Sequence, residues 1–213
     1  MKAWRQVVAA LVATLGVCVT LGAGAAELKE GIDFRVINPP LAADKNRIEI
    51  TEFFWYGCPH CFDFEPVLAT WVKKLPADVS FRRVPTISPN NKWLPGARLY
   101  YTLEAMNQLE KLHSEVFNAI HVERLRLEDE KILFEWVAKK GLDAKKFSEA
   151  WSSFGVQGRV QQARELTQAT GLTGVPGVMV QGRYLALTPG DYDQLLANID
   201  QLIARVRAEA GRK

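Results

Sequence analysis

The sequence predicts an α/β fold that carries an all-helical insertion. Short strand-like runs lie near both ends of the chain, a long stretch with helical periodicity separates them, and an amphipathic helix comes last. The predicted order is strand, strand, helix, strand, several helices, strand, strand and helix, which places the extra helices inside one sheet-forming unit. A chain of 213 residues with 48% hydrophobic content is long enough for a core with such an insertion.

Residues 1–26 are predicted to be a cleavable secretory signal peptide. Lys2 and Arg5 supply its positive charge, an apolar run follows, and small residues up to Ala26 provide a cleavage site. Removal of the segment lowers the formal charge from +3 to +1, so the charge does not favour nucleic-acid binding. Export would place the mature chain in an oxidising compartment, where disulfides persist.

Two strands are predicted after the signal peptide, from Asp33 to Ile37 and from Arg47 to Trp55. Both faces of the second strand are largely apolar, which is typical of a central strand that is covered on both sides. Glu52 stands on one of these faces. It is either a strand-end glutamate that reaches water or a partly buried acid whose pKa is raised by desolvation.

A redox-active cysteine pair is predicted where the second strand leads into a helix. Pro59 suits the first helical position, so Cys58 falls at the helix cap and Cys61 follows one turn later on the same face. At this spacing the two sulfurs can close a disulfide with little backbone movement. The unpaired N–H groups at the cap, including that of His60, and the positive end of the helix dipole favour a thiolate at Cys58 and lower its pKa.

Two other interpretations of the pair are a zinc site and an inert structural disulfide. A zinc site needs further ligands, but Cys18 lies in the signal peptide, and His113 and His121 do not have metal-ligand spacing. A structural disulfide that closes such a short loop gains little entropy. No metal is therefore expected.

The helix after the cysteines is expected to bend at Pro66, and a third strand follows from Val79 to Val84. Beyond a polar loop, five helices are predicted over residues 94–109, 111–121, 128–139, 143–153 and 156–169. Asp143 is the predicted N-cap of the fourth of these helices, and Gly171 is the predicted stop of the fifth.

The second of the five helices carries His113 and His121, which are expected to be surface residues. After the helices, Gly177 to Gln181 and Arg183 to Leu187 are predicted to form a hairpin across Gln181-Gly182. An amphipathic helix from Asp191 to Ala208 is the last predicted element.

The stretch around the cysteines resembles the active site of the DsbA family, the periplasmic thiol:disulfide oxidoreductases of Gram-negative bacteria. The resemblance rests on Cys58-Pro59-His60-Cys61, on the acidic and aromatic run before it and on the residues that follow as far as Pro66. It implies a thioredoxin fold with an inserted all-helical domain. The thioredoxin-like domain would comprise residues 27–85 and 170–213, and the helical insertion residues 86–169.

The resemblance also implies roles for two charged residues near the pair. Glu52 would pass a proton to or from Cys61. Arg83 would lie where relatives carry a lysine near that acid, although a solvated charge at the sheet edge is the alternative. His60 would stabilise the Cys58 thiolate or, alternatively, be an exposed ring of little consequence.

A second functional segment is implied far away in the sequence. In relatives with a thioredoxin fold, a cis-proline at the place of Pro176 packs beside the two cysteines. The backbone N–H and C=O of Val175 would then pair with an extended substrate peptide whatever its sequence.

The implied function is the donation of the Cys58–Cys61 disulfide to reduced, newly exported proteins, with no cofactor besides the cysteine pair. A DsbB-like membrane protein that passes electrons to quinone would reoxidise the enzyme, which is expected to be a monomer. One alternative is a periplasmic reductase or isomerase on the same fold. Another is a peptide-binding chaperone whose cysteines are incidental.

Overall fold

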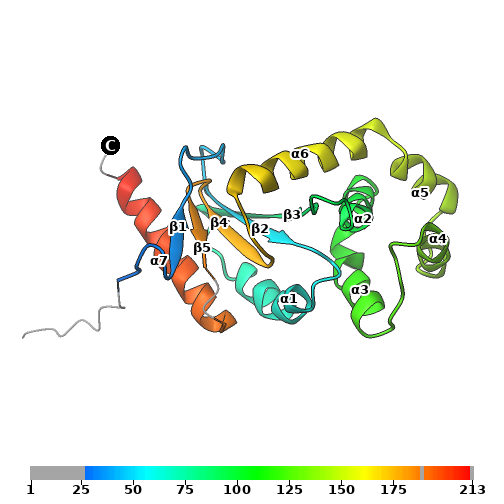
Figure 1. The fold of residues 1–213 in the computed structure, drawn as a ribbon, viewed down its shortest axis with the longest axis horizontal. Helices are drawn as coiled ribbons and strands as arrows, with labels where there is room; N and C mark the ends of the chain where they lie inside the picture. The colour runs from blue at the N-terminus through cyan, green and yellow to red at the C-terminus, as the bar shows by residue number, and fades with distance from the viewer. Residues whose placement is uncertain (1–26, 188–189, 212–213) are drawn as a thin grey trace, which may run out of the picture.

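The computed structural model describes residues 27–187 and 190–211, and the predicted signal peptide lies outside this part of the chain. The described residues form one sheet with helices beside it (Figure 1). The strands are β1 (Phe34–Val36), β2 (Ile48–Phe54), β3 (Val79–Pro85), β4 (Gly177–Val180) and β5 (Tyr184–Ala186). The helices are α1 (Pro59–Val72), α2 (Leu94–Ala105), α3 (Leu109–His121), α4 (Glu130–Lys139), α5 (Ala144–Trp151), α6 (Phe154–Thr170) and α7 (Tyr192–Ala210).

The sheet has the strand order β1-β5-β4-β2-β3, so β2 is an interior strand. It runs parallel to β3 and antiparallel to β4. All residues from Ile50 to Phe54 are buried, which confirms the prediction of a strand covered on both sides. The parallel register places Glu52 of β2 opposite Arg83 of β3, so these side chains leave the same face of the sheet.

The hairpin of β4 and β5 turns at Gln181 and Gly182, as predicted. Both residues have positive φ, 50° and 64°, and the N–H of Arg183 closes the turn by donating to the Val180 carbonyl at 3.0 Å, so that Val180 pairs with Tyr184. A Cβ atom on Gly182 would overlap the carbonyl of Leu41, so this position needs a glycine for space as well as for φ.

Two apolar clusters hold the fold together. Helices α1 and α7 pack against each other and α7 packs on the sheet (Figure 1), and the first cluster lies between these elements. Its fully buried members include Ile50, Phe64, Leu68, Val178, Leu195, Ile199 and Leu202. The second cluster runs from the end of β2 into the helical segment and includes Phe53, Phe54, Leu99, Leu103, Val116 and Phe117.

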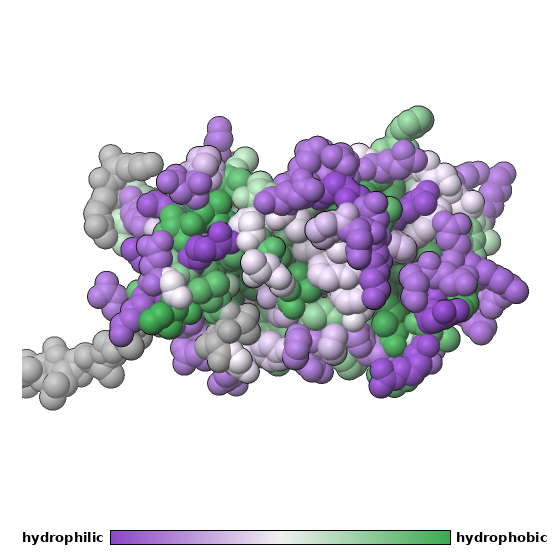
Figure 2. All heavy atoms as spheres, in the orientation of Figure 1, coloured by the Kyte–Doolittle hydropathy of each residue, from purple (hydrophilic) through white to green (hydrophobic). Residues whose placement is uncertain are grey.

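Helices α2 to α6 separate β3 from β4 in the chain and form a group beside the sheet (Figure 1). Helix α6 spans the distance back to the sheet, where it contacts β3. Hydrophilic residues dominate the helical end of the face in Figure 2, while hydrophobic residues gather over the sheet. The expected boundaries near residues 85 and 170 coincide with the ends of β3 and α6, and the division into two domains stays a prediction.

Local signals in the sequence explain where several helices begin and end. Asp143 accepts a hydrogen bond from the N–H of Lys146 at 3.0 Å, which confirms it as the N-cap of α5. Gly171 ends α6 in the left-handed conformation, with φ 59°. Helix α1 continues through Pro66 to Val72.

Neither a membrane-crossing helix nor a metal site is found in the part of the chain that the structure describes. None of the described helices combines the length and the hydropathy that a bilayer span needs. The described residues also contain no group of three or more histidine, cysteine or acidic side chains that could bind a metal ion together.

Candidate active site at the N-terminus of α1

Cys58 is the N-cap residue of α1, and Pro59 is the first residue of the helix. The backbone of Cys58 is extended, with φ −85° and ψ 119°, and its carbonyl accepts a hydrogen bond from the N–H of Phe62 at 3.1 Å. Cys61 lies within the first turn and is completely buried. The predicted placement of the pair at a helix N-terminus is therefore confirmed.

The two thiols, both free in this structure, differ widely in acidity. A hydrogen bond from the Cys61 thiol lowers the pKa of Cys58 to about 6, although burial opposes this, and the N–H groups of Cys61 and His60 contribute to the lowering. Burial raises the pKa of Cys61 far above its ordinary value, and the negative charge of Cys58 adds to the effect. At neutral pH the reduced pair therefore holds a thiolate at Cys58 and a thiol at Cys61.

The loop that contains Val175 and Pro176 lies against Cys58. The peptide bond between these two residues is cis, and the protonated thiol of Cys58 donates to the carbonyl oxygen of Val175 at 3.4 Å. The N–H of Val175 has no acceptor within the described chain. The loop thus has the geometry that the resemblance implied, except that the Val175 carbonyl is occupied while Cys58 is protonated.

Glu52 and Arg83 form an ion pair below the helix N-terminus. Arg83 Nε donates to Glu52 Oε2 at 3.0 Å, and the Glu52 side chain is 2% exposed. The interpretations of Glu52 as a glutamate that reaches water and of Arg83 as a solvated charge are therefore wrong. Burial raises the pKa of Glu52 to about 7 because the lowering effect of Arg83 is only partial. The charge of Glu52 also acts on Cys61, whose pKa it raises.

A second carboxylate, Glu65 of α1, completes this group. Arg83 Nη2 donates to both of its oxygens, at 2.9 and 3.0 Å. Glu65 is not among the residues predicted from the sequence, although its position offers a signal. It lies four residues after Cys61 and three before Leu68, on the buried side of the helix.

The expectation that His113 and His121 are surface residues is wrong for His113, while His121 is half-buried. His113 is 5% exposed, and its Nδ1 lies 2.8 Å from the hydroxyl oxygen of Tyr56. His121 Nε2 lies 2.8 Å from the carbonyl oxygen of Tyr56, and its ring stacks on Phe62. Helix α3 thereby holds Tyr56, two residues before Cys58, at both its side chain and its backbone.

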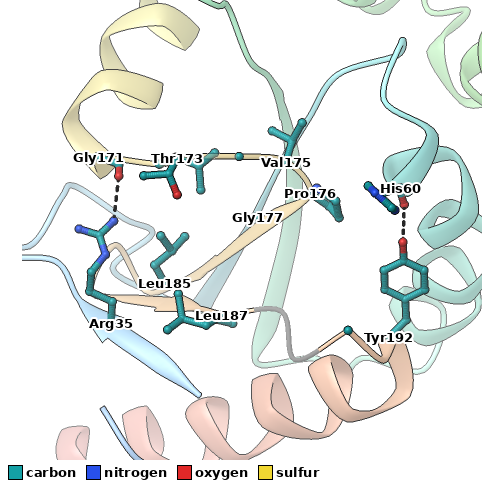
Figure 3. A pocket seen from close by; sticks show the side chains of 14 residues that line it. Arg35, His60, Gly171, Thr173, Val175, Pro176, Gly177, Leu185, Leu187 and Tyr192 are labelled. Carbon is teal, nitrogen blue, oxygen red and sulfur yellow. Dashed lines mark hydrogen bonds between the residues drawn. The ribbon is translucent and has the colours of Figure 1, made fainter. Parts of the chain in front are cut away.

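A cavity of about 640 Å³ opens beside the cis-proline loop (Figure 3). His60 and Tyr192 stand at one end, where the Tyr192 hydroxyl donates to the His60 carbonyl at 2.9 Å. Arg35 stands at the other end and donates to the carbonyl of Gly171 at 3.2 Å. The wall between them includes Leu172, Val175, Pro176, Leu185 and Leu187. The cavity is thus a largely apolar groove, and its His60 end lies next to the cysteine pair.

A family model described as the DSBA-like thioredoxin domain matches residues 79–200. A thiol:disulfide interchange protein DsbA of Bordetella parapertussis is 42% identical over 203 residues, which cover 93% of this chain and 94% of the relative. The chain belongs to the DsbA family. The activity of this family is thiol:disulfide exchange, so the protein is a thiol:disulfide oxidoreductase.

Solved structures support the membership in the DsbA family and confirm the predicted thioredoxin fold with a helical insertion. The crystal structure of DsbA from Pseudomonas aeruginosa matches with a TM-score of 0.80 and 36% identity, over 85% of this chain and 95% of that one. Reduced DsbA1 from Neisseria meningitidis matches with a TM-score of 0.78 and 29% identity, over 89% of this chain and the whole of that one.

Proposed function

We propose that the protein donates its Cys58–Cys61 disulfide to reduced polypeptides that have just been exported. The observation that carries this proposal is the place of Cys58 at the N-cap of α1, where the Cys61 thiol and the N–H groups of Cys61 and His60 lower its pKa to about 6. A thiolate at Cys58 exists only after the disulfide has been reduced, so its stabilisation favours the reduced enzyme. An enzyme whose reduced state is favoured takes electrons from its substrates and oxidises them.

The first step is the attack of a substrate thiolate on the sulfur of Cys58. A disulfide forms between substrate and Cys58 while the bond to Cys61 breaks, and Cys61 leaves with the electron pair. Because burial raises the pKa of Cys61, this sulfur must gain a proton as it leaves. Glu52 is protonated in part at neutral pH and supplies that proton.

The second step releases the oxidised substrate. Another thiolate of the substrate attacks the substrate sulfur of the mixed disulfide, and Cys58 leaves as a thiolate. The substrate has then lost two electrons and two protons in total, and the cysteine pair is reduced. The low pKa of Cys58 makes it a good leaving group in this step.

The cis-proline loop provides a docking edge for the substrate backbone. The Val175 N–H is free to donate, and the Val175 carbonyl becomes free once Cys58 has no proton to share. An extended peptide can pair with both groups and lay its side chains along the apolar cavity of Figure 3. Main-chain pairing of this kind predicts a broad range of substrates.

The cellular setting follows from the family and the predicted signal peptide. We infer that residues 1–26 direct the chain to the periplasm of a Gram-negative bacterium and are then removed. A DsbB-like, quinone-linked membrane oxidase would restore the disulfide, and no cofactor besides the cysteine pair would be needed. The protein would act as a monomer.

The reduction potential of the cysteine pair tests the proposed direction. Equilibration with glutathione buffers should give a value near that of DsbA, about −120 mV, rather than that of thioredoxin, about −270 mV. A value near the lower figure would instead support the reductase or isomerase alternative. A variant with both Cys58→Ser and Cys61→Ser should have no activity, whereas an incidental role of the cysteines in a chaperone predicts full activity.

A further inference from the structure

His113 belongs to a buried polar chain that reaches from α3 to the acid near the cysteine pair. The chain runs from the Tyr56 hydroxyl through His113 to Glu65, and from there through Arg83 to Glu52. Tyr56, Glu52, Glu65 and His113 are all buried. The described mechanism uses Glu52 but gives no role to His113.

The contacts of His113 define its tautomer. Burial lowers the pKa of His113, so the ring is neutral at pH 7 and carries one N–H. Its Nε2 is buried, makes no hydrogen bond within the described chain, and has a carboxylate oxygen of Glu65 as its ion-pair neighbour at 3.4 Å. An anion requires a donor, so the proton resides on Nε2, and Nδ1 accepts from the Tyr56 hydroxyl at 2.8 Å.

The other ionisable groups around His113 are few. They are Tyr56 before α1, Glu65 on α1, Arg83 on β3 and Tyr100 on α2, whose ring lies edge-on to the imidazole. The two tyrosines are neutral at pH 7, and burial raises their pKa values further. The charge next to His113 is therefore that of the pair formed by Glu65 and Arg83.

The two carboxylates that share Arg83 are not equivalent. Glu52 receives one hydrogen bond from the guanidinium, whereas Glu65 receives two and also faces the N–H of His113. Burial would raise the pKa of Glu65, but His113 and Arg83 together hold it below its ordinary value. Since two buried carboxylates close to one cation do not both stay ionised easily, the one with fewer donors takes up a proton first.

We propose that His113 is a positioning residue that decides which of these two carboxylates holds the proton, by keeping Glu65 ionised and leaving the proton to Glu52. Glu52 is the carboxylate whose charge acts on Cys61, so this assignment puts the proton where the leaving thiolate needs it. The inference rests on the proposed role of Glu52 in proton transfer. It makes a helix of the insertion part of the redox centre.

Two substitutions at one position separate the two contacts of His113. Asn retains a carboxamide near the place of Nδ1, toward Tyr56, and loses the donor to Glu65. Gln extends its amide N–H to the place of Nε2 and retains that donor. The measurement is the pH titration of the carboxyl carbons of Glu52 and Glu65 by NMR in protein labelled with ¹³C-glutamate, with signals assigned through Glu52→Gln and Glu65→Gln.

In the His113→Asn protein, the midpoint of Glu65 should rise and that of Glu52 should fall. The fall should be about one pH unit, the size of the effect that one neighbouring charge, here that of Glu65, has on a carboxyl pKa. His113→Gln should keep the wild-type order of the two midpoints. Unchanged midpoints in His113→Asn, or equal shifts in both variants, would overturn the proposal. If His113→Asn does not fold, Tyr56→Phe provides a second test. Without the Tyr56 hydroxyl, Nδ1 of His113 has no donor and the proton is no longer fixed on Nε2. The midpoints of Glu52 and Glu65 should then shift in the same directions as in His113→Asn, but less.

This result is independent of whether Glu52 takes part in the reaction. A shift of the Glu52 midpoint in His113→Asn, combined with an unchanged rate in Glu52→Gln, would retain the coupling and refute the proton transfer. A reduced rate in Glu52→Gln, combined with an unchanged Glu52 midpoint in His113→Asn, would support the proton transfer and refute the coupling to His113. Thermal melting of each variant is measured separately and shows whether that variant is folded.

Discussion

At the scale of single residues, the acidity of Cys58 is the property on which the chemistry depends. The ultraviolet absorbance of the thiolate in the reduced protein should rise with a midpoint near pH 6, because the Cys61 thiol and the helix N-terminus stabilise the anion. The Cys58→Ser variant should lack this transition. A midpoint above pH 8, the range of an ordinary cysteine at about 8.5, would remove the basis for the oxidase direction.

Replacement of Glu52 by Gln removes the proton donor for Cys61 and leaves the size of the side chain unchanged. The rate at which a thiol opens the Cys58–Cys61 disulfide should fall at least roughly tenfold, and its dependence on pH near 7 should flatten. Glu49→Gln is a suitable control, because Glu49 lies on the same strand and pairs with Arg82 instead. Stopped-flow kinetics would measure the rate of disulfide opening in the Glu52→Gln and Glu49→Gln variants. Equal rates in the two variants would contradict the role of Glu52.

The sequence was sufficient to identify the cysteines, the cis-proline segment and Glu52, but not the polar chain behind them. The helical spacing contained part of the missing information: His113 lies four residues before Phe117 and His121 four after it, on the apolar side of α3. A buried histidine needs polar partners close to its two nitrogens. Those partners, Tyr56 and Glu65, come from elements more than forty residues away, so spacing along one helix could not reveal them.

At the scale of structural elements, the cap of α5 tests whether the helical segment and the redox site respond separately. Asp143→Ala removes the hydrogen bond to the N–H of Lys146 and should lower the free energy of unfolding by about 1 kcal/mol. Chemical denaturation measures this loss. The reduction potential should stay constant, because α5 contributes no residue to the polar chain, and a changed potential would contradict that separation.

The connection from β2 to α1 is tightly packed at Gly57, where there is no space for a side chain. A Cβ atom on Gly57 would overlap the ring of Trp55, which stacks on Trp93 at a centroid distance of 4.8 Å. Gly57→Ala should therefore displace Trp55, change the tryptophan fluorescence and lower the melting temperature. In Gly96→Ala, the control, the new Cβ would meet Tyr56 at an ordinary 3.7 Å, so neither fluorescence nor activity should change.

The order of the elements, the caps and the hairpin turn were predictable because local chemistry determines them. The turn at Gln181-Gly182 and the caps at Asp143 and Gly171 depend on residues a few positions apart. The pairing of β2 with both β3 and β4 depends on contacts between distant segments. The ion pair of Glu52 and Arg83 was left open for the same reason, since it needs the register of two strands.

At the scale of the whole molecule, the helical segment takes part in the active site as well as in the core. Helix α3 supplies both histidines that hold Tyr56, and α2 supplies the tyrosine that lies edge-on to His113. The sheet supplies Glu52, Arg83 and the cis-proline loop. The redox centre therefore lies where the two parts of the chain meet, and changes to the side chains that either part contributes to the polar chain should influence the acidity of the pair.

The acidity of Cys58 should also make the stability of the reduced protein depend on pH. Its pKa is depressed from an ordinary value of about 8.5 to about 6, so the stabilisation is fully present above about pH 8.5 and is lost as pH falls through 6. At pH 7 about 1 kcal/mol remains once solvent screening at the partly solvated sulfur is allowed for. The oxidised protein has no thiolate and lacks this contribution.

The melting temperature of the reduced protein, relative to that of the oxidised protein, should therefore decline from pH 9 to pH 6. The Cys58→Ser variant, which cannot form the disulfide or the thiolate, should show the pH dependence of the oxidised protein. A difference between the reduced and oxidised proteins that does not vary over this range would show that the protein does not stabilise the Cys58 thiolate, and the proposed direction of electron flow would lose its physical cause.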